Sequence, residues 1–294
     1  MILTIGSVNI DHAHRAAALP GAGETVFDKG YVKSLGGKGA NQSLAARLAG
    51  AEVRHAGAVG ADGAWCRERL AGAGIDVADL VTVEAATGHA VILIDDAGEN
   101  SIIVHGGANR ALTPALIDRA IGRARPGDWL LLQNETNLVA EAARAGRAAG
   151  LRVAYAAAPF DPVATAEVIP HVDLLAVNAV EAAQLARHLG APSESLGVPV
   201  LLVTEGASGA HCWTGRQKLH QDAFRVVPVD TTGAGDCYLG YFLAGLDDGM
   251  PLDEALRLAA AAAAIQVTRP GAAEALPAKA EVFAFLAERG AKSA

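Results

Sequence analysis

Short apolar runs and helical patterns alternate along the second half of the chain. Their order is an apolar strand at 128–132, a helix at 137–149, strands at 151–155 and 172–177, a helix at 179–189 and a strand at 200–203. Strands joined by helices form parallel βαβ units, whose sheet is covered on both faces. The pattern therefore predicts an α/β protein with a central, mostly parallel sheet flanked by helices.

The first third of the chain follows a different pattern. Ile2–Ile5 predicts an opening strand, residues 31–35 have the alternation of a strand, and 88–95 with 101–104 predict a hairpin turning at 96–100. We expect the segments at about 10–35 and 87–105 to form a small separate β-sheet that acts as a lid. Since no linker and no repeat interrupts the chain, we expect a single domain over residues 1–294.

The same periodicities predict further elements around this framework. Ala40, Leu44, Ala45 and Leu48 fall on one face of a helix. Residues 212–229 predict two or three short strands. Further helices are expected directly after Gly235, at 252–267 and, as an amphipathic surface helix, at 279–288.

Polar residues follow several of the predicted strands at the point where each strand ends. They are Asn9 and Asp11, then Gln133, Asn134 and Glu135, then Asn178 and Glu181, and finally Thr204 and Glu205 before Gly206. Any one of them can be a turn residue or a helix cap. Because the carboxyl ends of parallel strands meet at one edge of a sheet, their recurrence predicts a binding site there.

Composition narrows the class of protein and of partner. Of 294 residues, 51% are hydrophobic and only 4% aromatic, which favours a core of aliphatic side chains and alanine between helices and a parallel sheet. The net charge of −8, without a basic tract, argues against a nucleic-acid partner. The apolar tract at 258–267 is about half of a membrane span, so we expect no membrane partner.

The cysteines and the N-terminus bear on the compartment. Cys66, Cys212 and Cys237 are far apart and lack the spacing of a zinc site, so we expect buried, reduced thiols. The first residues lack the basic region and long apolar run of a signal peptide. We therefore expect a cytoplasmic protein whose partners are small solutes.

The stretch 230–236, Asp-Thr-Thr-Gly-Ala-Gly-Asp, combines a turn, a helix start and a carboxylate. Glycines at 233 and 235 allow a positive φ and close approach to a ligand, and an apolar helix follows at once. The free N–H groups at the start of a helix bind anions, and Asp236 lies in that first turn. Taken alone, a Gly-x-Gly-Asp tetrapeptide such as 233–236 is more often a structural turn with a capping carboxylate than a catalytic site.

A second glycine-rich stretch at 36–42 leads into the helix that contains Ala40. It supplies donors in Lys38 and Asn41. It is not a phosphate-binding Walker A loop, since Gly39 rather than Ser or Thr follows the lysine, and no Gly-x-Gly-x-x-Gly dinucleotide fingerprint occurs in the chain. Both P-loop and dinucleotide-dependent enzyme classes are therefore disfavoured.

The order of these motifs resembles the ribokinase group of the PfkB-type carbohydrate kinase family over nearly the whole chain. The stretches 36–42 and 230–236 match the two family signatures, with support from 6–11, 23–26, 178–181 and 267–272. The resemblance implies a ribokinase-like, Rossmann-like three-layer fold with a small β-sheet lid. It also implies an ATP-dependent kinase that phosphorylates a primary hydroxyl of a sugar.

The leading substrate hypothesis is D-ribose, converted to D-ribose 5-phosphate. The alternatives are a related kinase for another sugar, a keto-acid sugar or a nucleoside, and, from a different class, a non-catalytic sugar or nucleotide sensor. A sensor would be expected to lose its base, and Asp236 is present.

The resemblance also implies a role for each residue of the site. Asp236 is expected to be the general base, and Gly233, Ala234 and Gly235 an anion hole worth about 3 kcal/mol per donor. The sugar is expected to contact Asn9, Asp11, Gly37, Lys38, Asn41, Glu135 and Asp236. The nucleotide is expected near Asn178, Thr204, Gly206 and Gly235.

The same resemblance implies two kinds of metal ion and a homodimer formed through the lid. Glu181 is expected to orient Mg²⁺ largely through water. Asp230, Thr232 and backbone carbonyls around Arg269 and Gly271 are expected to surround K⁺. Ala275 stands where the family commonly has a serine hydroxyl for that K⁺. Residues 156–159 and the short region 191–198 also depart from the family pattern, on the nucleotide side.

Overall fold

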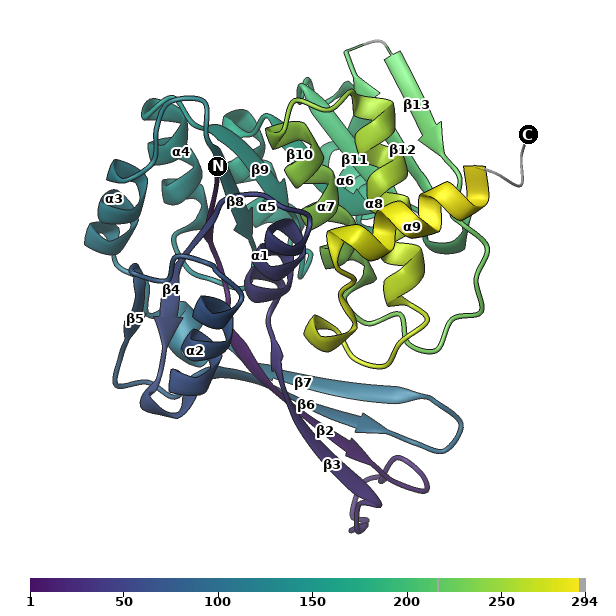
Figure 1. Cartoon of the computed structure of the whole chain (residues 1–294). Helices are drawn as coiled ribbons and strands as arrows, with labels where there is room; N and C mark the ends of the chain where they lie inside the picture. The colour runs from purple at the N-terminus through teal and green to yellow at the C-terminus, as the bar shows by residue number, and fades with distance from the viewer. Residues whose placement is uncertain (216, 291–294) are drawn as a thin grey trace.

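The computed structural model describes residues 1–215 and 217–290. Within these residues a nine-stranded sheet forms the middle of three layers (Figure 1). From one edge to the other the strands are β13 (Gln217–Gln221), β12 (Ala210–Thr214), β11 (Val200–Thr204), β10 (Leu174–Asn178), β9 (Arg152–Ala156), β8 (Trp129–Gln133), β1 (Ile2–Ile5), β4 (Val53–Val59) and β5 (Leu80–Thr82). In this order, all strands from β11 to β5 are parallel to one another. At the edge, β12 is antiparallel to β11, and β13 is antiparallel to β12. The predicted mostly parallel sheet is confirmed.

Helices cover both faces of this sheet. One face carries α1 (Lys38–Leu48), α2 (Ala64–Gly72), α7 (Ala234–Asp247), α8 (Leu252–Gln266) and α9 (Lys279–Gly290). The other carries α3 (Pro114–Gly122), α4 (Val139–Ala148), α5 (Pro162–Val168) and α6 (Ala179–Leu189). Successive strand residues point to opposite faces, so Leu131 belongs to the first core and its neighbours Leu130 and Leu132 to the second. The predicted three-layer α/β architecture is confirmed.

A small four-stranded sheet projects from the body, at the bottom of Figure 1. Its order is β3 (Gly30–Gly36), β2 (Asn9–Arg15), β6 (Gly88–Ile94) and β7 (Asn100–His105). The separate sheet predicted from 10–35 and 87–105 is therefore present, and we call it the lid. Along the described chain, no helix is long and apolar enough to cross a membrane.

Two details of the predicted elements need correction. Asn9 and Asp11 are not loop residues behind β1; they lie in β2, because the chain pairs with β3 and β6 directly after Val8. The helix around Ala40 is buried on nearly all sides, including Gln42 and Ser43, because it lies between the sheet and α7. The two or three short strands predicted at 212–229 are present as two, β12 and β13, and the described residues 222–229 form no strand.

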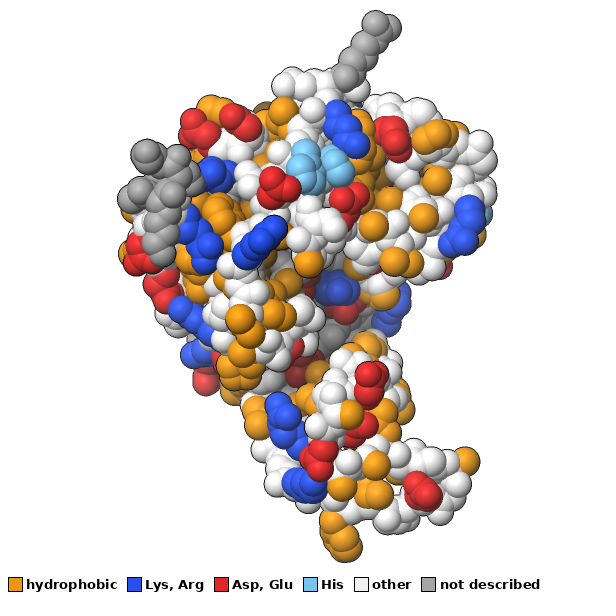
Figure 2. Space-filling model, turned by 90° about the vertical axis from the view of Figure 1, so that its right-hand side faces the viewer, with side chains coloured by type: hydrophobic (Ala, Val, Ile, Leu, Met, Phe, Trp, Pro, Cys, Tyr) orange, Lys and Arg blue, Asp and Glu red, His pale blue; other side chains and the backbone are white. Residues whose placement is uncertain are grey.

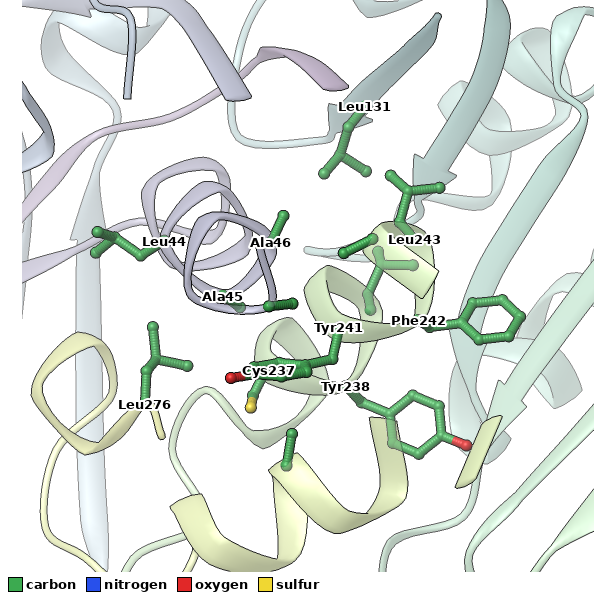
Figure 3. Close-up of a cluster of buried hydrophobic side chains, with 14 of the residues drawn as sticks. Leu44, Ala45, Ala46, Leu131, Cys237, Tyr238, Tyr241, Phe242, Leu243 and Leu276 are labelled. Carbon is green, nitrogen blue, oxygen red and sulfur yellow. The ribbon is translucent and has the colours of Figure 1, made fainter. Parts of the chain in front are cut away.

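Helices α1 and α7 pack at unusually short range. A Cβ atom at Gly240 would lie 2.5 Å from Ala45 Cβ and 2.8 Å from the Gln42 carbonyl oxygen, so only glycine fits between the helices. Figure 3 shows Ala45 on the side of α1 that faces α7, next to Tyr241. This contact brings the start of α1, which follows the glycine-rich stretch at 36–42, beside the first turn of α7.

Candidate active site

Asp236 lies in the first turn of α7 and is only 8% exposed. Gly233 caps the helix in the left-handed conformation, with φ 75° and ψ 3°, which turns the loop sharply into the helix. The N–H groups of residues 234 and 235 are among the first of the helix, where intrahelical partners are missing. The predicted helix start after Gly233, with a carboxylate in its first turn, is therefore present in the structure. The Ala234 N–H donates to the Thr231 carbonyl at 3.2 Å.

Three amide side chains connect Asp236 to α1 and β8. Asn41 Nδ2 donates to Oδ2 of Asp236 at 3.2 Å, and Gln42 Nε2 donates to Oδ1 at 2.8 Å. Gln133 Nε2 in turn donates to Gln42 Oε1 at 2.7 Å. Gln42 and Gln133 had no predicted role, although both lie in stretches that the sequence singled out, 36–42 and the polar end of the strand at 128–132.

Glu135 organises the start of α1. Its Oε2 accepts from the backbone N–H of Lys38 at 2.9 Å and from the Ser7 hydroxyl, and that hydroxyl oxygen also accepts from the Gly39 N–H at 3.1 Å. The carboxylate predicted to bind sugar thus holds the glycine-rich stretch against the end of β1. Ser7 is a further member of the site, and its position directly after β1 was the available signal.

Asn9 and Asp11 reach the site from the lid. Asn9 Oδ1 accepts from Asn109 Nδ2 at 2.7 Å, and Asn109 Oδ1 accepts from the Val8 N–H at 3.0 Å. Asn109 was not predicted, since it lies in an isolated short turn. In strands, alternate residues share a face, so Asn9 and Asp11 point to the same side of β2.

The electrostatics of the site are dominated by carboxylates. Burial, followed by the charges of Glu135, Glu274 and Asp236, raises the pKa of Asp11 from 3.8 to about 7. The charge of Asp236 is the main reason why the pKa of Lys38 is raised, with burial opposing it and Glu135 and Glu181 adding to it. Lys38 is therefore held as a cation beside the carboxylates.

A cavity of about 540 Å³ adjoins the start of α7. Thr204, Gly206 and Gly235 line it, as predicted for a nucleotide site, together with apolar side chains that include Val226, Tyr238, Ala260, Ala263 and Val267. A larger hollow of about 740 Å³ lies at the amino ends of the strands and contains none of the predicted residues. The cavity of about 540 Å³ is thus lined by Ala234 and Gly235, the two residues that precede Asp236 in the chain.

Asn178 and Glu181 form a capping box at the start of α6. Glu181 N–H donates to Asn178 Oδ1 at 2.9 Å, and Asn178 N–H donates to Glu181 Oε2 at 2.8 Å. Asn178 pairs in register with Thr204, which places both at the same edge of the sheet. Burial raises the pKa of Glu181, while the Asn178 N–H and the charge of Lys38 act against that shift.

Asp230 joins the two loops predicted to hold a monovalent cation. Its Oδ1 accepts from the Thr232 N–H at 2.9 Å and its Oδ2 from the Gly271 N–H at 2.9 Å. Burial alone would raise the pKa of Asp230, but these hydrogen bonds and that of the Thr232 hydroxyl hold it below its usual value. Arg269, of which only the backbone carbonyl was predicted to take part, pairs through its side chain with Glu281 at 2.5 Å. The buried Ala275 offers only a methyl group.

Two further stretches, 156–159 and 191–198, were predicted to depart from the family pattern. The peptide bond between Ala158 and Pro159 is cis, and the Pro159 carbonyl accepts from Asn134 Nδ2 at 3.1 Å. Residues 191–198 contain only a short 3₁₀ turn, Ser193–Ser195, between α6 and β11. The predicted shortness of this region is therefore visible in the fold.

Comparison with known proteins assigns the fold and site to a class. The model of the pfkB family carbohydrate kinases matches residues 1–279. The chain is 35% identical to a ribokinase of Bacillus subtilis, covering 97% of this chain and 99% of that protein. Ribokinase structures from Thermotoga maritima (TM-score 0.87, 32% identity, 97% and 99% coverage) and from Arabidopsis thaliana in complex with ribose and ATP (0.83, 29%, 97% and 98%) are similar throughout.

The chain therefore belongs to the pfkB family of carbohydrate kinases. The family, the ribokinase-like fold and the sugar kinase activity predicted from the motifs are confirmed. The site agrees with phosphoryl transfer, which requires mainly positioning and stabilisation of charge. Figure 2 shows basic and acidic side chains gathered in the hollow between the body and the lid.

Proposed function

We propose that the protein transfers the γ-phosphate of ATP to the primary hydroxyl of D-ribose, giving D-ribose 5-phosphate. The observation that carries this proposal is the position of Asp236. Its carboxylate accepts hydrogen bonds from Asn41 and Gln42 of α1, and the residue before it, Gly235, lines the cavity of about 540 Å³. Ribokinases similar over nearly the full length support ribose as the sugar.

In this reaction Asp236 is the general base. Asp236 would take the proton of the sugar hydroxyl as that oxygen attacks the γ-phosphate, a role that contributes about 10²–10⁴-fold. The N–H groups at Gly233, Ala234 and Gly235 would stabilise the charge on the transferring group at the start of α7. Lys38, held as a cation by Asp236, adds a positive charge close by.

The sugar would be held by residues from both the body and the lid. Asp11 and Asn9 come from β2, and Gly37, Lys38 and Asn41 from the start of α1, with Glu135 behind them. Asn41 Oδ1 is buried and has no hydrogen-bond partner among the described residues, which leaves an acceptor for a sugar hydroxyl. Carboxylate and amide oxygens on opposite sides suit a sugar with vicinal hydroxyls.

The nucleotide would occupy the cavity lined by Thr204, Gly206 and Gly235, with its phosphates directed toward Asn178. Glu181 uses only one of its oxygens in the capping box, so the other is available to a hydrated Mg²⁺. When bound there, Mg²⁺ neutralises phosphate charge. The residues of the chain supply the base, the anion hole and the sugar contacts.

A monovalent-cation site fits these residues only in part. Asp230, Thr232 and Gly271 are brought together by hydrogen bonds, but Ala275 supplies no hydroxyl. The site with Asp230, Thr232, Arg269 and Gly271 stays a prediction, tested by the dependence of kcat on K⁺ with tetramethylammonium as the control salt. A rate that is unchanged by K⁺ would remove this site from the proposal.

We further propose a cytoplasmic homodimer in which residues 1–294 form one domain and the lids of two subunits pair. The lid exposes large apolar side chains, with Val32 61%, Ile102 51%, Ile103 71% and Val104 57% exposed. By register, Val32, Ile102 and Val104 share one face of the lid and Ile103 lies on the other. Exposed apolar side chains on a projecting sheet mark protein interfaces. Sedimentation of an Ile103→Lys variant tests the dimer: wild type should sediment as a dimer and the variant as a monomer.

The substrate is tested with a coupled assay of ADP release over pentoses, hexoses, keto-acid sugars and nucleosides. We expect ribose to give the highest kcat/KM. Efficient turnover of another acceptor without ribose would refute the substrate but keep the kinase. In Asp236→Asn we expect kcat to fall at least about a hundredfold while the ATP KM is nearly unchanged. Near-normal turnover in that variant would exclude Asp236 as the base.

A further inference from the structure

A chain of buried amides leads from the centre of the sheet to the proposed base. Gln133, at the end of β8, is fully buried, and Gln42, on α1, is 1% exposed. Gln133 Nε2 donates to Gln42 Oε1 at 2.7 Å, and Gln42 Nε2 donates to Asp236 Oδ1 at 2.8 Å. Three secondary-structure elements, far apart in sequence, are thus joined through side chains only.

The direction of this chain matters because an amide group has two ends. Gln42 stabilises the Asp236 carboxylate only when its NH₂ group faces the carboxylate. The reverse orientation would place Gln42 Oε1 against Oδ1, which is repulsive. Because Gln133 donates to Gln42 Oε1, it holds Gln42 in the favourable orientation.

The two oxygens of Asp236 are therefore in different surroundings. Oδ1 is tied to α1 by the short bond from Gln42, whereas Oδ2 accepts the longer bond, 3.2 Å, from Asn41. Asn41 belongs to the proposed sugar site, so Oδ2 is the oxygen on the sugar side. A carboxylate fixed through one oxygen presents the other in a constant direction.

We propose that Gln42 and Gln133 are positioning residues for the general base, and that they aim Oδ2 of Asp236 at the sugar hydroxyl. Neither residue touches the sugar or the nucleotide in this arrangement; they act through Asp236. The inference rests on the proposed function, since it requires Asp236 to be the base. Close packing of α1 and α7 at Gly240 is what makes the bond between Gln42 and Asp236 possible.

The test uses side chains of matched size that cannot donate. Gln42→Met removes the donor to Asp236, and Gln133→Met removes the donor that orients Gln42. The control is Ser43→Ala, which neighbours Gln42 in α1, is fully buried, and bonds to Thr4 and His55 rather than to Asp236. Each substitution is made in the wild type and in Asp236→Asn, and kcat and both KM values are measured.

In the wild type, Gln42→Met should lower kcat about 10- to 100-fold, the size of one hydrogen bond to a charged group. Gln133→Met should lower kcat about two- to tenfold, as expected for a neutral bond. The KM values for ribose and ATP should change less than about threefold, because uniform binding is retained. Ser43→Ala should leave kcat nearly unchanged even if it lowers the melting temperature.

The double variants separate positioning from general stability. If Gln42 acts through Asp236, then Gln42→Met should change the residual kcat of Asp236→Asn less than about twofold. An equal loss in both backgrounds, or a wild-type kcat in Gln42→Met, would overturn the inference. If Gln42→Met does not fold, as judged by circular dichroism, the same comparison with Gln133→Met decides. Loss of the proposed function would be recognised separately, by normal turnover in Asp236→Asn alone.

Discussion

The substitution Asp11→Asn should stabilise the ligand-free protein at alkaline pH and should raise its KM for ribose. Burial and the charges of Glu135, Glu274 and Asp236 raise the pKa of Asp11 to about 7 from 3.8. A carboxyl group with a higher pKa in the folded than in the unfolded chain binds its proton more tightly when folded. Below pH 3.8 the carboxyl is protonated in both states and costs the folded chain no stability. As the pH rises toward 7, the unfolded chain ionises more readily, so the free energy of unfolding falls progressively.

The magnitude follows from the size of the shift. About three pKa units at 1.36 kcal/mol each limit the loss in free energy of unfolding to about 4 kcal/mol above pH 7. Between pH 5.5 and pH 8 this cost grows by about 2 kcal/mol at most. Asp11 is only partly buried, so we expect about 1–2 kcal/mol, which at about 2–4 °C per kcal/mol raises the melting temperature by about 2–8 °C.

The measurement is thermal unfolding of wild type and Asp11→Asn at pH 5.5 and pH 8 without sugar or nucleotide. The gain in the variant should be larger at pH 8. Asp96→Asn is the control, because Asp96 is also on the lid but is 63% exposed in an ion pair with Lys29, and such pairs contribute little. A variant that is less stable than wild type at pH 8, or a gain independent of pH, would refute the reasoning.

Three further predictions concern activity and the loops. The kcat/KM for ribose should fall below about pH 7, because Asp11 then takes up its proton. Asp11→Asn should have a raised KM for ribose and should lack this fall at low pH. A wild-type kcat/KM that does not change with pH would contradict this prediction. Gly233→Ala should cost about 1–3 kcal/mol and lower kcat, because φ is 75° and the new Cβ would lie 3.0 Å from that of Ala272. The control is Gly249→Ala, where φ is 77° and the new Cβ would have no atom within 4 Å. This variant should lower the melting temperature less than Gly233→Ala does and should leave kcat unchanged. Ala263→Phe should fill the cavity and raise the ATP KM at least about tenfold with the ribose KM unchanged; equal ATP KM values would place the nucleotide elsewhere.

Local patterns were enough to determine the architecture. The alternation of apolar strands and helices after residue 128 predicted the parallel sheet, since the period of side chains along each element follows directly from backbone geometry. The hairpin at 88–104 and the strand at 31–35 predicted the lid for the same reason. Glycines at 233 and 235 before an apolar run marked the start of α7, because few other residues adopt the turn that opens it.

Only the tertiary structure decided which polar side chains meet. Gln42 reaches Asp236 because Gly240 lets α1 and α7 approach, a contact between positions almost 200 residues apart in sequence that leaves no trace in periodicity. Asp11 acquires its high pKa only when the lid strand carries it among Glu135, Glu274 and Asp236. The sequence by itself determined the elements and the residue types at their ends; burial, pKa and the partners of each amide depend on distances that packing alone sets.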